Sequence, residues 1–100
     1  MIMKIMVKNA VNTAHMNPPD GSKSWHVYWQ KHVSIFGLAR LANMCCPRCG
    51  MPVEEELIDG AHVVIANDES GKMYICPLCK RCNQMNGEFE VEACLLVEIK

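Results

Sequence analysis

The sequence predicts a small α+β fold in which an N-terminal helix packs on an antiparallel sheet, with a zinc-binding module inserted between them. Three observations lead to this prediction. Aromatic residues recur every three or four positions between residues 25 and 36, as on one face of a helix. Apolar and mostly charged residues alternate from 88 to 100, as in a strand with one buried face. Between these segments, six cysteines lie in two short clusters, residues 45–49 and 76–82.

Length and charge limit the possible functions. The chain has 100 residues, 50% of them hydrophobic, and we expect one domain over residues 1–100. Ten Lys and Arg against 11 Asp and Glu give a net charge of −1, so no overall positive field attracts nucleic acid. No apolar run reaches the ~20 residues of a membrane span, and early lysines interrupt any secretory signal. We therefore expect a cytoplasmic protein without membrane contact; the sequence leaves the oligomeric state open.

The N-terminal third predicts a strand, a turn and a helix. Residues 2–8 are apolar and β-branched enough for a short strand, although such a start is also compatible with a tail. Residues 17–22 contain two prolines and a glycine and predict a turn. Ser24 is a suitable N-cap for a helix that we expect to end at Gly37. Its apolar face, which we expect to be core, comprises Trp25, Tyr28, Trp29, His32, Val33 and Phe36.

The remaining segments predict a hairpin and a long last strand. Residues 38–44 fit either a helical turn or a strand. Residues 54–56 are expected on a strand with a solvated face, and 59–60 in a turn with His62 at the entrance of the next strand. Residues 63–65 and 73–75 predict a hairpin around a polar loop, and 76–85 run into a short helix. A single strand is expected from 88 to 100.

The cysteines favour a metal site over disulfides. Their number, seven, is odd, no export signal precedes them, and two segments carry closely spaced CxxC pairs. Such pairs on two segments are the usual way to build a tetrahedral Zn(Cys)4 site. With four thiolates and one Zn²⁺ bound, the net charge would become about −3.

Spacing selects the candidate ligands. In the first cluster Cys46 and Cys49 form the CxxC pair. On an extended chain, the side chain of Cys45 points to the opposite side from that of Cys46. In the second cluster, Cys76, Cys79 and Cys82 form two overlapping pairs. We favour Cys79 and Cys82, which bracket the first turn of the short helix, with Cys76 as the alternative ligand. The predicted ligands are Cys46, Cys49, Cys79 and Cys82; Cys45 is the spare cysteine of the first cluster, and Cys94 is expected to be a free thiol.

Three segments carry a resemblance to a known family. In order they are CPRCG from Cys46, DGAHV from Asp59 and YICPLCKRCN from Tyr74. Their order resembles the treble-clef zinc fingers of the HNH endonuclease superfamily, and the likeness covers a module of residues 45–86. GAHV and PLCxxCN also look like motifs of a group of small bacterial and phage proteins. The resemblance implies a treble clef with an HNH-like ββα core and a structural zinc.

The resemblance also implies two candidate catalytic residues. His62 matches the first histidine of the HNH motif, the general base that activates water for attack on phosphate. Asn83 takes the place of the last histidine and can ligate a hard cation through its amide oxygen. Ala61 stands where active members have a metal-binding aspartate, and Tyr74 replaces the central asparagine. His62 can equally be a packing residue or can orient a cysteine ligand.

Two function classes follow. The first is a zinc-stabilised module with degenerate nuclease chemistry that binds DNA, RNA or a protein partner. The second is a divergent nuclease that uses His62 and Asn83 with Mg²⁺ or Mn²⁺. Nearby basic residues can hold a phosphate in either case, or can be ordinary solvated charges. They are Arg48, Lys72, Lys80 and Arg81.

Overall fold

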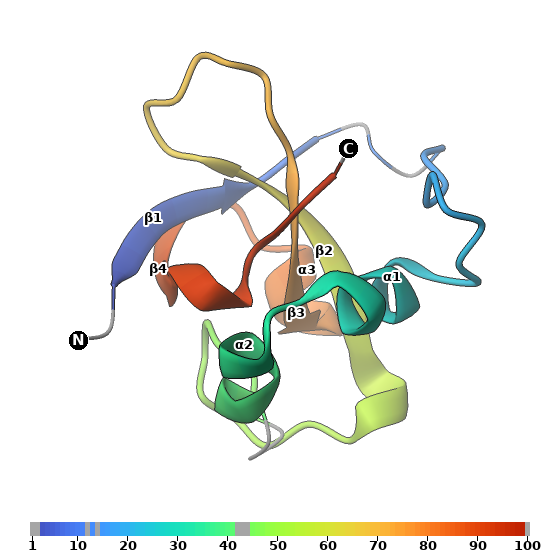
Figure 1. The fold of residues 1–100 in the computed structure, drawn as a ribbon. Coiled ribbons are helices and arrows are strands. Elements are labelled where there is room, and N and C mark those ends of the chain that lie inside the picture. The colour runs from blue at the N-terminus through green and yellow to red at the C-terminus, as the bar shows by residue number, and fades with distance from the viewer. Residues whose placement is uncertain (1–2, 12, 14, 42–44, 100) are drawn as a thin grey trace.

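The computed structural model describes residues 3–11, 13, 15–41 and 45–99, which are built around one sheet (Figure 1). In these residues the sheet has five strands in the order β4-β1-β2-β3-β5, and each pairing is antiparallel. The strands are β1 (Lys4–Asn9), β2 (Ile58–Ile65), β3 (Tyr74–Cys79), β4 (Glu88–Glu92) and β5 (Val97–Glu98). The helices are α1 (Trp25–His32), α2 (Ile35–Arg40) and α3 (Lys80–Asn83), with 3-10 turns η1 (Glu55–Leu57) and η2 (Ala93–Leu95). The predicted α+β class with an antiparallel sheet is confirmed.

The N-terminal strand lies inside the sheet. β1 pairs with β4 on one side and with β2 on the other, so that Val7 is opposite both Phe89 and Ile65. Val7 is fully buried. The predicted strand is therefore present from Lys4 to Asn9, whereas Ile2 lies outside the described residues.

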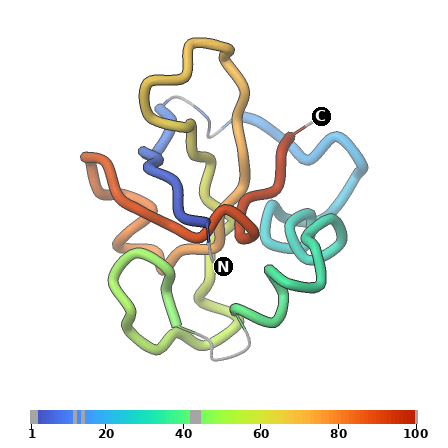
Figure 2. Tube along the Cα trace, turned by 60° about the vertical axis from the view of Figure 1, so that its left-hand side comes forward, coloured from blue at the N-terminus to red at the C-terminus, as the bar shows by residue number. Residues whose placement is uncertain are grey.

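The C-terminal segment is not the single strand that its alternation predicts. β4 ends at Glu92, η2 follows, and β5 begins at Val97 on the opposite edge of the sheet. Figure 2 shows this red segment passing across the fold before it runs to the C-terminus. Four residues, 93–96, thus connect the two edges, which requires a strongly curved sheet because four residues span only about 14 Å. The alternation is retained on both sides of the turn, so the sequence pattern conceals the break.

Two helices replace the single helix predicted from Ser24 to Gly37. Ser24 caps α1 as predicted, its side chain accepting a hydrogen bond from the Val27 N–H (3.2 Å). The helix ends at His32 because Val33 is extended and Ser34 caps α2, accepting from the Gly37 N–H. Of the described part of residues 38–44, Leu38 to Arg40 continue α2. Residues 42–44 lie outside the described part of the chain.

The predicted apolar face is only partly buried. Trp29 and Tyr28 are buried, and Trp29 donates from Nε1 to the Leu95 carbonyl at 2.7 Å. Phe36 is 73% exposed, so placing it in the core was wrong, and His32, on the same predicted face, is exposed as well. The helix break at residue 33 rotates Phe36 away from the face that α1 presents to the sheet.

The segment before the hairpin also differs from the prediction. Residues 55–57 form η1 rather than a strand. Asp59 and Gly60 belong to β2, and His62 lies in the middle of this strand instead of at its entrance. β2 and β3 form the predicted hairpin, with Val63 opposite Tyr74. β2 begins before Gly60 because Ile58 pairs with Cys79 of β3, a contact that the local sequence does not indicate.

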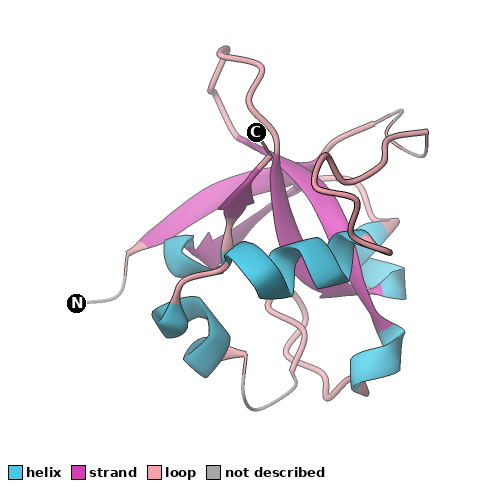
Figure 3. Ribbon diagram, turned by 45° about the vertical axis from the view of Figure 1, so that its right-hand side comes forward, coloured by secondary structure: helices cyan, strands magenta, loops and turns pink. Residues whose placement is uncertain are grey.

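The two faces of the sheet carry separate buried clusters. On one face α1 packs across β2 and β3 (Figure 3). Trp29 belongs there to one buried cluster with Ile58 and Ile75. On the other face Val7 and Ala61 pack with the buried cysteines. No helix among the described residues is both long and apolar enough to cross a membrane.

Candidate metal centre and adjoining cleft

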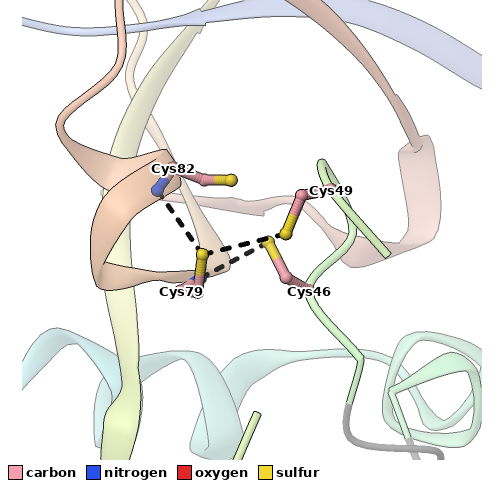
Figure 4. A group of neighbouring side chains, drawn as sticks. All are labelled: Cys46, Cys49, Cys79 and Cys82. Atoms are coloured by element: carbon pink, nitrogen blue, oxygen red, sulfur yellow. Dashed lines mark hydrogen bonds between the residues drawn. The ribbon is translucent and has the colours of Figure 1, made fainter. Parts of the chain in front are cut away.

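Four cysteine thiols meet at one end of the β2–β3 hairpin. Their sulfur atoms all lie within 4.8 Å of one another, and we call the group the thiol cluster (Figure 4). It comprises Cys46, Cys49, Cys79 and Cys82. Two come from the loop before η1, and two from the junction of β3 and α3. The cluster can therefore hold a structural metal ion such as zinc.

The spacing of the sulfurs fits a tetrahedral zinc. With Zn–S bonds of about 2.3 Å, neighbouring sulfurs of a tetrahedron lie roughly 3.8 Å apart. The Cys49 and Cys79 sulfurs, which come from different segments, are 3.9 Å apart. All four donors are thiols, the ligand type that zinc prefers in structural sites. Four protein ligands would leave no coordination position for water.

Local backbone structure holds each pair of thiols. In the first pair, the Gly50 N–H donates to the Cys46 carbonyl at 2.8 Å, and the Cys46 N–H donates to the Met51 carbonyl at 2.9 Å. These two hydrogen bonds close a tight turn. In the second pair, Cys79 caps α3, and its sulfur accepts from the Cys82 N–H at 3.4 Å. The Cys79 N–H in turn donates to the Cys46 sulfur at 3.4 Å, which joins the two segments.

The electrostatics of the thiol cluster favour a bound cation. The backbone N–H of Met51 lowers the pKa of the Cys49 thiol to about 7. Burial raises the pKa of Cys46 and of Cys82, because a buried thiolate loses its hydration. Four thiols at this spacing cannot all ionise on their own, and a divalent cation removes that penalty by offsetting the charge.

The other cysteines lie outside the thiol cluster. Cys76, the alternative ligand, is fully buried in β3 opposite Ala61, and burial raises its pKa. Cys45 is half-buried beside the turn, where its backbone forms an isolated antiparallel β-bridge with Pro52. Cys94 lies in η2. The group within 4.8 Å is thus the set that we favoured from spacing. Its role as the ligand set stays a prediction.

A cleft of about 690 Å³ adjoins β2 on the side of α1. We call it the β2 cleft, and it holds both candidate catalytic residues, His62 and Asn83. Asp59 also lines the cleft; it accepts a hydrogen bond from Asn83 Nδ2 at 3.2 Å and forms an ion pair with Lys80 at 2.8 Å. The structure thus brings together the two residues that the resemblance implied, although their catalytic roles stay a prediction.

Both imidazoles that line the cleft have a buried ring nitrogen without a hydrogen-bond partner. His62 is only 8% exposed, its Nε2 has no partner, and its ring contacts Trp25 edge to face at 4.6 Å between centroids. His26 is half-buried, with neither ring nitrogen partnered. Burial lowers the pKa of both, although Glu55 and Asp59 partly oppose this for His26. Both rings are therefore neutral at pH 7.

Sequence reasoning missed part of this cleft. His26, Glu55 and Glu56 line it, yet they belong to α1 and η1 and are separated from His62 along the chain. The signal was weak, because a helix-face histidine and a run of glutamates are typical of solvated surfaces. Only the close packing of α1 on β2 at Gly60 brings them together.

Comparison of the chain with protein-family models, curated protein sequences and solved structures finds no significant match. The likeness to the HNH superfamily therefore depends on the motif residues alone, and the functional argument depends on the thiol cluster and the β2 cleft.

Proposed function

We propose that this protein is a zinc-stabilised binding module in which the metal is structural. The observation that carries the proposal is the closed set of four thiols within 4.8 Å. A zinc ion held by Cys46, Cys49, Cys79 and Cys82 would have no open position for a water or a substrate. Its contribution is to hold the turn of residues 45–52 against the start of α3.

The order of elements supports a treble clef of the HNH type over residues 45–86. A tight turn with two thiols comes first, the β2–β3 hairpin follows, and α3 supplies the other two thiols. This is the ββα arrangement that the motifs imply. α3 has only four residues and few hydrogen bonds of its own, so its stability would depend strongly on the bound metal.

The chemistry of the module is degenerate in this proposal. Ala61 takes the place of the metal-binding aspartate, and its side chain faces the buried cysteine cluster, away from the β2 cleft. His62 is buried against Trp25, and no lysine or arginine among the described residues lines the cleft. Glu55, Glu56 and Asp59 make the lining acidic, which disfavours a phosphodiester. These observations favour a protein over DNA or RNA as the partner.

A divergent nuclease is the second candidate. The observation that favours it is that His62, Asp59 and Asn83 line one cleft, so Asp59 can supply the carboxylate that Ala61 lacks. Such a site would use Mg²⁺ or Mn²⁺, with His62 as the general base. Against it, Lys80 already neutralises Asp59, and one further basic residue near the motif, Arg48, is engaged within the protein, over the Phe89 ring and with the Asn86 carbonyl.

Metal content and cleavage test both candidates on one preparation. We expect one zinc per chain by elemental analysis of protein purified without chelator. Cys46→Ser should lose the zinc and the cooperative unfolding transition, because a small domain depends on such a metal. The matched control, Cys45→Ser, alters the neighbouring thiol outside the cluster and should retain both. Cys76→Ser should also retain the zinc, at a cost of about 1–3 kcal/mol for burying a hydroxyl.

The same preparation is then incubated with plasmid DNA and Mg²⁺ or Mn²⁺. The binding module predicts no cleavage that depends on His62. Cleavage that disappears in His62→Ala while the zinc and the fold remain would replace the proposal with the nuclease. Absence of zinc, or a folded Cys46→Ser variant, would contradict the structural-metal role itself.

A further inference from the structure

The β2 cleft exposes hydrogen-bond acceptors from the backbone as well as from side chains. β1 covers the edge of β2 as far as His62, whose carbonyl accepts from the Ala10 N–H at 2.9 Å. Carbonyls on a strand point to alternate sides, so that of Gly60 faces the same edge as that of His62. β1 offers it no strand partner, because their pairing stops at Val63. The Gly60 carbonyl thus faces the cleft, which Gly60 lines.

The side chains of the cleft add further acceptors and negative charge. Glu55 and Glu56 are exposed carboxylates on η1, and Glu55 is hydrogen-bonded to the neutral side chain of Gln30. Neither has a cation within ion-pair distance among the described residues, whereas Asp59 has Lys80. His26 and His62 also line the cleft, although their unpartnered ring nitrogens are themselves buried in the lining.

The lining therefore suits a cation that is rich in N–H donors. A metal ion fits it less well, because the only group of three or more potential ligands that converges among the described residues is the thiol cluster. A guanidinium group fits better, since its planar fork can reach separate carboxylate and carbonyl acceptors at once. Trp25 adds an aromatic wall on which a planar cation can stack.

We propose that the β2 cleft binds the guanidinium group of an arginine side chain from a protein partner. Glu55 and Glu56 supply the charge, the Gly60 carbonyl accepts a hydrogen bond, Trp25 forms the aromatic wall, and Asp59 stays paired with Lys80. This inference rests on the proposed binding role and names the chemistry of its partner.

The test is an NMR titration of the ¹⁵N-labelled, zinc-loaded chain with N-acetyl-arginine methylamide. A single side chain is expected to bind with a Kd on the order of 1 mM. The amide of Gly60 and the indole N–H of Trp25 should shift, and those of the distant hairpin loop, residues 67–72, should not. The citrulline derivative has the same shape without the charge and should shift nothing at equal concentration. Equal binding of citrulline, or shifts away from the cleft, would overturn the proposal.

Charge variants locate the site. The double variant Glu55→Gln/Glu56→Gln keeps the shape of both side chains and should weaken binding at least about tenfold. Glu54→Gln removes the adjacent charge, which does not line the cleft, and should leave the Kd within about twofold. An equal loss in both variants would mean a general electrostatic attraction and would refute a built site.

Two further arms fix the source of the cation and separate this proposal from the previous one. Tighter binding of free arginine than of the capped derivative would assign the site to a small molecule and overturn the protein partner. Capped arginine binding at least as tightly supports the partner. If one zinc is bound and no arginine derivative shifts the cleft, this inference fails while the structural-zinc role stands. If zinc is absent, the structural-zinc role fails whatever the titration gives.

Discussion

Replacing Gly60 with alanine tests how α1 is held against the sheet, and with it one wall of the β2 cleft. An ideal Cβ at position 60 lies 2.5 Å from the Trp25 carbonyl carbon and 2.6 Å from the His26 amide nitrogen. Ordinary contacts between carbon atoms begin at about 3.5 Å, so α1 must move away from β2 by about 1 Å. Both neighbours are backbone atoms, and no side-chain rotation relieves the clash.

The expected cost combines two effects. Overpacking of this kind costs about 1–3 kcal/mol. A shift of about 1 Å also stretches the 2.7 Å hydrogen bond between Trp29 Nε1 and the Leu95 carbonyl beyond hydrogen-bond length, which costs about 1 kcal/mol more. We expect the free energy of unfolding to fall by about 2–4 kcal/mol, and the Tm by roughly 10–25 °C.

The assay is urea unfolding of the zinc-loaded chain, followed by tryptophan fluorescence, with zinc measured on the same samples. The control is Gly71→Ala, where no atom lies within 4 Å of the added Cβ and only the positive φ of 81° opposes the change. That control should cost about 1 kcal/mol. A Gly60→Ala variant within about 0.5 kcal/mol of wild type, or less affected than the control, would refute the proposed packing.

Three further changes probe the same face of the sheet. Trp29→Phe removes the donor to the buried Leu95 carbonyl and should lower the free energy of unfolding by about 2 kcal/mol in urea; an unchanged value would contradict that bond. Ser24→Ala removes the N-cap of α1 and should cost about 1 kcal/mol by thermal unfolding, with a null effect arguing against the cap. Burial lowers the pKa of His26 and His62, so the unfolded chain binds more protons as pH falls below about 6.5 and stability should decrease there. His62→Gln should lose less stability between pH 7.5 and 5.5 than wild type, and an identical loss would show that this imidazole is not the acid-sensitive group.

The elements with a local chemical cause could be predicted from the sequence. The Ser24 cap needs only a hydroxyl three residues before the Val27 N–H, and the hairpin needs only two apolar runs around a polar loop. The grouping of Cys46 and Cys49 with Cys79 and Cys82 follows from CxxC spacing, because each pair converges within one turn.

Features that depend on distant partners could not be predicted. Gly37 resembles a helix stop, yet it lies inside α2. The position requires glycine because a Cβ there would lie 2.2 Å from the Cys94 carbonyl oxygen. The alternation from residue 88 onward specifies a buried face but not a neighbour, so it cannot reveal that β4 and β5 join opposite edges. His62 lies among apolar residues, and only the packing of α1 makes it part of a cleft.

The position of β1 between β2 and β4 has a consequence for biosynthesis. Val7 leaves the ribosome before its two neighbours, Ile65 and Phe89, which follow 58 and 82 residues later. At about 5–20 residues per second, the first strand therefore waits several seconds for its second neighbour. The hairpin and all four clustered thiols are made before β4, so the half that carries the thiol cluster can assemble while the sheet still lacks an edge. β1 precedes the other described strands in translation yet is among the last to be enclosed, which leaves it exposed to chaperones and to wrong pairing on the nascent chain.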